Sequence, residues 1–228
     1  MADGYLTSDG VRFLRELKAH NDKAWFEKNK ARFEEGVRAP AQRLMADLAP
    51  VLAKISPHFV VDLRPSGGSL SRIHRDTRFS KDKSPYKTHL FAHFHHEDGT
   101  DDFSPGFFVR LGPGESAVGA GVWRPGPTAL AKIRAAMVAD AAAWRKAKQK
   151  VLAAGGRVIP GEPLKKVPKG FDPEHEHAED LKQKSVGLVL DLPDAALTSP
   201  SLPKEIAERF RLAAPAVRFV CAAVGLDA

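Results

Sequence analysis

The chain has 228 residues, of which 43% are hydrophobic and 28% are charged. This balance is typical of a soluble globular protein, and the length fits either one large domain or two small ones. The one cysteine, Cys221, excludes an intrachain disulfide and any zinc site built from several cysteines. The net charge of +7 is compatible with a nucleic acid, a phosphorylated ligand or another anionic surface, and it favours none of them.

The sequence shows no targeting or membrane segment. Its N-terminus lacks the basic and apolar regions of a secretory signal. No stretch approaches the roughly 18 to 20 apolar residues that a membrane helix needs. We therefore expect a cytoplasmic protein with no membrane partner.

The first third of the chain is predicted to be helical. Ser8 is positioned to cap a first helix, and Asn21 a second. The charged residues between Lys28 and Glu35 are expected to form the solvated face of this second helix. A third helix is predicted over roughly residues 41–55, where Pro50 would kink or divide it.

The middle of the chain changes to the alternating pattern of β-strands. Strands are predicted at residues 69–74, 87–96, 106–111 and 116–123, which favours a mostly antiparallel meander. Within residues 87–96, one face is apolar and the other is aromatic and histidine-rich. The first face carries Leu90, Ala92 and Phe94, and the second carries His89, Phe91, His93 and His95.

The last hundred residues are predicted to be mostly helical. The predicted elements are a helix from Pro127, a helix at 140–152, a short helix at 174–182, a strand at 185–192, and helical segments at 204–213 and 216–224 broken at Pro215. The region near 155–173 has the length of a lid or of a joint between subdomains. Helices and strands are segregated, so we predict an α+β fold with N-terminal helices, a central sheet and C-terminal helices.

Charged residues are concentrated at residues 72–87, which contain six lysines and arginines and only two aspartates. A strand is predicted to end near Arg75, Phe79 to anchor a loop, and the next strand to begin at Tyr86. Arginine offers a planar fork of donors for carboxylate or phosphate, so we predict a site for an anionic small molecule. Its residues are Arg72, Arg75, Asp76, Arg78, Ser80, Lys81, Asp82, Lys83, Tyr86 as a wall, and Lys87.

The same segment also has a structural interpretation. Asp76 and Asp82 would pair with the arginines and fix a loop, and the protein would then serve a structural or partner-binding role. The two interpretations are compatible, because two aspartates cannot neutralise six cations.

A nucleic-acid-binding module is a second alternative. It requires the cations to continue as a stripe beyond residue 87, together with aromatic rings able to stack on a base. The candidate cations are Lys165, Lys166, Lys169, Lys182 and Lys184, and the candidate rings are Trp25, Tyr86 and Trp123.

A metal-dependent hydrolase is a third alternative. His93 and His95 share a strand face with His89 and suit zinc, and His175 and His177 would add ligands from a distant segment. The nearby carboxylates, expected in a hairpin loop, are Asp98, Asp101 and Asp102. No HExxH spacing, nucleophile elbow or Walker loop occurs, so we assign no metal, cofactor or reaction.

Several motifs resemble a bacterial family called domain of unknown function 2461. They are Phe13-Leu14-x-x-Leu17 with Asn21 and Trp25-Phe26, the run from Arg72 to Lys87, Pro105-Gly106-Phe107-Phe108, Gly119-Ala120-Gly121-Val122-Trp123-x-Pro125, Pro168-Lys169-Gly170-Phe171, and Leu181-Lys182-x-Lys184. The run from Arg72 to Lys87 is the most specific, and Ala120 stands where another glycine is expected. The resemblance covers nearly the whole chain. The resemblance implies a single α+β domain over residues 1–228, and it assigns no activity.

Overall fold

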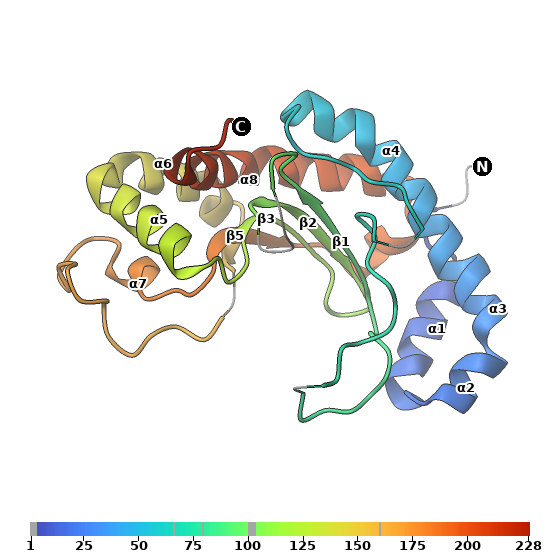
Figure 1. Ribbon diagram of the computed structural model, residues 1–228. Helices are drawn as coiled ribbons and strands as arrows, with labels where there is room; N and C mark the ends of the chain where they lie inside the picture. The colour runs from blue at the N-terminus through green and yellow to red at the C-terminus, as the bar shows by residue number, and fades with distance from the viewer. Residues whose placement is uncertain (1–3, 66, 79, 100–103, 160) are drawn as a thin grey trace.

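The computed structural model describes residues 4–65, 67–78, 80–99, 104–159 and 161–228. Its helices lie toward both ends of the chain and a five-stranded antiparallel sheet lies between them, which confirms the predicted α+β class. Figure 1 shows the N-terminal helices and the pair α5 and α6 at opposite ends of this sheet. The roles predicted for Phe79, Asp101 and Asp102 lie outside the described residues.

The N-terminal arm consists of short helices that follow one another closely. They are α1 (Ser8–Ala19), α2 (Lys23–Lys28), α3 (Lys30–Phe33), the π-helical turn η1 (Glu34–Arg38) and α4 (Ala39–Ile55). The caps differ from those predicted, because Thr7 caps α1 and Asp22 caps α2. Asn21 instead clamps the backbone of Tyr86, accepting its N–H at 3.0 Å and donating to its carbonyl at 2.9 Å. Pro50 lies within α4 and does not divide it.

The sheet has the order β1-β2-β3-β5-β4, and all neighbouring strands are antiparallel. Its strands are β1 (Leu90–His95), β2 (Gly106–Leu111), β3 (Ala117–Val122), β4 (Arg157–Val158) and β5 (Val186–Asp191). The predicted meander is confirmed for β1, β2 and β3. In β1, Leu90, Ala92 and Phe94 are buried on one face, as the alternation predicted.

The strand predicted at residues 69–74 is wrong as an extended element. Leu70 forms an isolated bridge with Ala92 on β1, and His74 forms one with Tyr86. Between them the segment leaves the sheet and bonds to residues 85–87, where Arg75 donates to the carbonyl of Pro85 at 2.9 Å. Proline has no N–H to return, so this ladder cannot continue.

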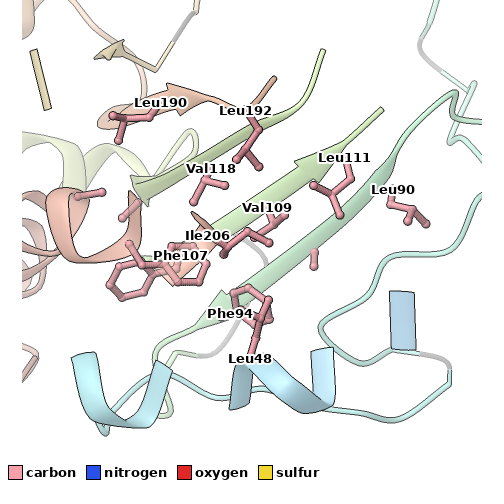
Figure 2. Close-up of a cluster of buried hydrophobic side chains, with 14 of the residues drawn as sticks. Leu48, Leu90, Phe94, Phe107, Val109, Leu111, Val118, Leu190, Leu192 and Ile206 are labelled. Atoms are coloured by element: carbon pink, nitrogen blue, oxygen red, sulfur yellow. The ribbon is translucent and has the colours of Figure 1, made fainter. Parts of the chain in front are cut away.

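Helix α8 (Leu202–Val224) covers the apolar face of the sheet. Its Phe210 ring lies 5.8 Å from Phe94 and 4.9 Å from Phe107, measured between ring centroids. Figure 2 shows these strand residues with Leu48 of α4 and Ile206 of α8 in one apolar layer. The break predicted at Pro215 is wrong, because α8 continues through it. The cost of an internal proline, about 3 kcal/mol, is offset by the burial of residues on both sides of Pro215.

The C-terminal arm packs on α8 and begins with α5 (Pro127–Ala139) and α6 (Ala141–Ala153). After β4, a long connector leads to the short α7 (Ala178–Leu181), and the 3₁₀ turn η2 (Asp194–Thr198) follows β5. Within the part of the chain that the structure describes, every helix is too short or too polar to span a bilayer.

Candidate ligand cavity

A cavity of about 440 Å³ lies between the N-terminal helices and the segment of residues 62–74. Its floor is apolar and comes from α2, α3, α4, the 62–74 segment and the start of β1. The floor residues are Phe26, Phe33, Met45, Leu70, Ile73 and Leu90. A mostly apolar cavity of this size with a few polar groups is typical of small-molecule sites.

The π-helical turn η1 shapes one wall of the cavity. Gly10 of α1 meets η1 backbone to backbone, since a Cβ on Gly10 would lie 2.0 Å from the carbonyl oxygen of Gly36. Only glycine permits this approach. On the other side of the turn, Glu34 and Arg38 both line the cavity and pair at 3.0 Å. Single π-helical turns within α-helices are frequent at functional sites.

The charged groups of the cavity divide into paired and unpaired ones. Arg38 pairs with Glu34, and Arg64 pairs with Asp62 at 2.5 Å. Over the described ranges, the side chains of Lys30, Arg72 and Glu27 make no hydrogen bond and no ion pair. These three side chains are exposed and lie among the lining residues. The cavity therefore presents two cations and one carboxylate that the fold itself does not satisfy.

Most other cations of the 72–87 segment form hydrogen bonds or ion pairs within the segment or with the residue just before it. Lys83 donates from Nζ to the carbonyl of Thr77 at 2.9 Å, and Lys87 donates to Ser71 Oγ and to the carbonyl of Arg72, also at 2.9 Å. Arg75 pairs with Asp82, and Arg78 with Asp76 at 2.7 Å. Ser80 lies 3.5 Å from the Arg75 guanidinium, while exposed Lys81 makes no such contact to any described residue.

The two aspartates of the segment are held in the ionised form. The guanidinium and backbone N–H of Arg78 lower the pKa of Asp76 to about 2. Hydrogen bonds from Ser84, and then from Arg75, lower the pKa of Asp82 well below its usual range. The predicted structural pairing is thus present, and it uses the two aspartates on Arg75 and Arg78.

Tyr86 and His89 flank the cavity in different ways. Tyr86 is 3% exposed and stacks on Phe26 at 4.1 Å between ring centroids, so it supports the floor from behind and is not among the lining residues. His89 lines the cavity, and burial together with Arg110 lowers its pKa to about 4. Its Nδ1 accepts from Arg110 at 3.2 Å. At neutral pH the wall therefore carries a neutral imidazole.

Of the ten residues predicted to bind an anion, Arg72 is the one that lines this cavity. The other described members form the loop beside it or, for Tyr86, the packing behind it. Lys30 and Glu34 were missed because they were assigned to a solvated helix face, and Arg38 was given no role. Their charge pattern alone carries no sign of the cavity, because the opposite wall lies some 30 residues further along the chain.

The family model described as Conserved hypothetical protein (DUF2461) matches residues 9–219, a range that includes both walls of the cavity. The chain belongs to the DUF2461 family. Neither a curated protein nor a solved structure matches it. The resemblance seen in the sequence motifs of this DUF2461 protein is therefore confirmed, and the cavity must be interpreted from its own geometry.

The histidines predicted to bind a metal fall into two groups in the DUF2461 fold. His93 and His95 lie on the same strand face, with ring centroids 6.3 Å apart. His177 is 3% exposed and its Nε2 donates to the carbonyl of Ala141 at 2.8 Å, while the His175 Nδ1 accepts the His177 backbone N–H. Across the described ranges, no three His, Cys, Asp or Glu residues are arranged to hold a metal ion.

Proposed function

We propose that this protein binds a small anionic molecule with an apolar body in the 440 Å³ cavity. The observation that carries this proposal is the state of Arg72. Arg72 lines the cavity, and its guanidinium makes no hydrogen bond or ion pair to the described residues. The two arginines that follow it in the segment are both paired with aspartates.

The composition of the cavity supports a ligand with two distinct parts. Phe26, Phe33 and Met45 form a buried floor suited to an apolar ring or short chain. Arg72 and Lys30 at the rim suit a carboxylate or phosphate, and the arginine fork can bind either one through two parallel hydrogen bonds. The ligand would therefore place its anionic group at the rim and its apolar body on the floor.

The unpaired side chain of Glu27 further restricts the ligands that the cavity would bind. Glu27 lines the same rim and makes no ion pair in the part of the chain that the structure describes. Bringing an anion next to a free carboxylate costs energy, so the ligand's charge would lie on the side of Arg72 and Lys30. A hydrogen-bond donor on the ligand would suit the side of Glu27.

The proposal is tested by titrating phenyl phosphate into the protein and measuring binding by calorimetry. Arg72→Gln should weaken binding roughly tenfold or more, because a hydrogen bond to a charged group contributes about 1.5 to 3 kcal/mol. The matched control is Lys81→Gln, which removes an exposed cation that does not line the cavity and should leave the affinity unchanged.

Inorganic phosphate is the second probe in this experiment. It carries the anionic group without the ring, so it should bind more weakly than phenyl phosphate. Equal affinity of Arg72→Gln and the unmodified protein for phenyl phosphate would contradict the proposal. Equal affinity for the two probes would show that the ligand's apolar body does not contribute to binding.

A further inference from the structure

A second surface, at the other end of the sheet, carries an exposed tryptophan beside a strained arginine. Trp123 follows β3 directly and is 48% exposed. Arg124 has φ of +43°, and no other non-glycine residue in the described ranges has a positive φ. Such a conformation is unfavourable for a residue with a side chain, and residues held in it cluster at functional sites.

The two side chains are arranged as a platform. The Arg124 guanidinium lies 5.9 Å from the centroid of the Trp123 ring, which is the geometry of a cation–π contact. The backbone N–H of Arg124 donates to the buried hydroxyl of Ser185 at 3.0 Å, so the unusual backbone is fixed to the neighbouring segment. Nearly half of the Trp123 surface stays accessible beside this cation.

Further cations gather around Trp123 because of the sheet register. Val122 pairs with Val186, which places Lys184 alongside Arg124 on the adjoining segment. Arg134 of α5 donates to the carbonyl of Gln183 at 2.9 Å, and its buried Nε has no hydrogen-bond partner in the described part of the chain. Lys184 likewise makes no hydrogen bond or ion pair to a described residue.

The connector adds two more cations to the same region. Leu164 donates its backbone N–H to the carbonyl of Lys182 at 2.9 Å, which brings the exposed Lys165 and Lys166 to the segment that carries Lys184. The carboxylate of Glu179 is engaged by Lys182 at 2.5 Å, and Glu162 lies in the connector. Cations outnumber carboxylates here. We call this surface the Trp123 patch, and it comprises Trp123, Arg124, Arg134, Lys165, Lys166 and Lys184.

We propose that the Trp123 patch binds a nucleotide unit, with the base stacked on Trp123 and the phosphate held by Arg124 and Lys184. An accessible aromatic face flanked by cations that form no ion pair with a described residue matches the alternation of base and phosphate in a single strand. A purely acidic partner would use the cations and leave the indole ring without a role. This site is separate from the cavity and does not depend on it, because none of the residues of the Trp123 patch lines the cavity.

Either a free nucleotide or a single-stranded nucleic acid would supply the base and the phosphate. One experiment distinguishes the two ligands. A fluorescein-labelled 12-nucleotide oligothymidylate is titrated at low salt and followed by anisotropy, and thymidine monophosphate is titrated in parallel and followed by calorimetry. Binding of the oligonucleotide alone assigns the site to a polymer. Binding of the mononucleotide with comparable affinity assigns it to a free nucleotide.

Three variants test the residues of the patch. Trp123→Ala should raise the dissociation constant about fivefold or more, because stacking contributes about 1 to 3 kcal/mol per base. Lys184→Gln should lower the slope of log affinity against log salt by about one for the oligonucleotide. Arg124→Gly removes the charge but keeps a residue that tolerates φ of +43°, so its weaker binding is not a folding effect.

Two control variants test whether binding depends only on the net charge of the protein or on the cavity. Lys146→Gln removes an exposed lysine of α6, and Arg72→Gln removes the cavity cation. Both should bind the oligonucleotide like the unmodified protein. The proposal is overturned if neither nucleotide probe binds, if Trp123→Ala binds the oligonucleotide normally, or if polyglutamate of equal length binds as tightly.

Discussion

The 72–87 segment and the buried cluster beside α6 both use charge to hold irregular backbone, and they differ in exposure. In the segment, the side chains of Asp76 and Asp82 are 49% and 60% exposed. In the cluster, Asp180 accepts from Trp144 Nε1 at 2.9 Å and pairs with Lys148, and the two charged side chains are only 9% and 15% exposed. The cluster joins α7 and the end of the long connector to α6.

A region with many charges does not necessarily contribute more to stability than a region with few. Exposed ion pairs contribute about 0 to 1 kcal/mol each, so the pairs of the 72–87 segment fix local geometry and leave the fold to buried residues such as Ile73 and Tyr86. Breaking one partner of a buried pair is far more costly, because the other charge stays buried without a partner.

The largest expected effect comes from Asp180→Ala. Removing this carboxylate leaves Lys148 and the Trp144 indole N–H without their acceptor in a buried place, so we expect a loss of about 3 to 5 kcal/mol in the free energy of unfolding. Urea unfolding followed by Trp fluorescence measures it. The matched control is Glu176→Ala, which breaks the exposed pair with Arg145 and should change the free energy of unfolding far less, because solvent screens an exposed pair. Similar losses in both variants would contradict the comparison.

A smaller effect is expected when both arginine pairs of the 72–87 segment are removed together. The double variant Arg75→Ala and Arg78→Ala should melt within a few degrees of the unmodified protein, because the pairs are exposed. It should also keep its affinity for phenyl phosphate, since neither residue lines the cavity. Thermal unfolding and calorimetry check the two outcomes. Unfolding of the double variant would show that the segment is a structural hub after all.

The smallest effect concerns acid. The pKa of Asp76 is lowered from 3.8 to about 2 in the folded protein, so its stabilisation is present above pH 4 and is lost as the pH falls to 2. The melting temperature of Asp76→Asn should therefore lie below that of the unmodified protein at pH 5 and approach it at pH 2. Glu208→Gln, which removes an exposed carboxylate outside the segment, is the control. If the difference in melting temperature between the two proteins does not change with pH, the ion pair between Asp76 and Arg78 does not stabilise the fold.

Local patterns in the sequence predicted β1, β2, β3 and β5, but they missed β4, added a strand at residues 69–74 and broke α8 at Pro215. The alternation in β1 assigned Leu90, Ala92 and Phe94 to one face because side-chain direction in a strand depends only on position along it. Pro215 misled the prediction of α8, since the burial that outweighs an internal proline comes from strands distant in sequence. Helix propensity depends on neighbouring residues in the sequence, whereas the burial of α8 depends on tertiary contacts that the sequence does not show.

The candidate cavity could be predicted only in part. The charge of residues 72–87 indicated an anion site, but it did not indicate that Arg75 and Arg78 are paired while Arg72 is not. That distinction depends on where the backbone turns after the His74 bridge to Tyr86. Lys30 on the opposite wall is recognised as part of the site only when α3 and the 72–74 segment are seen to face each other across the cavity.

The position of α8 at the end of the fold has a consequence for synthesis. The ribosome synthesises all five strands before it makes Phe210, the ring against which Phe94 and Phe107 pack. Until then the apolar face of the nascent sheet lacks its main cover (Figure 2). Such transiently exposed surface is prone to aggregation. The chain is therefore expected to stay vulnerable to chaperone capture until its last helix emerges.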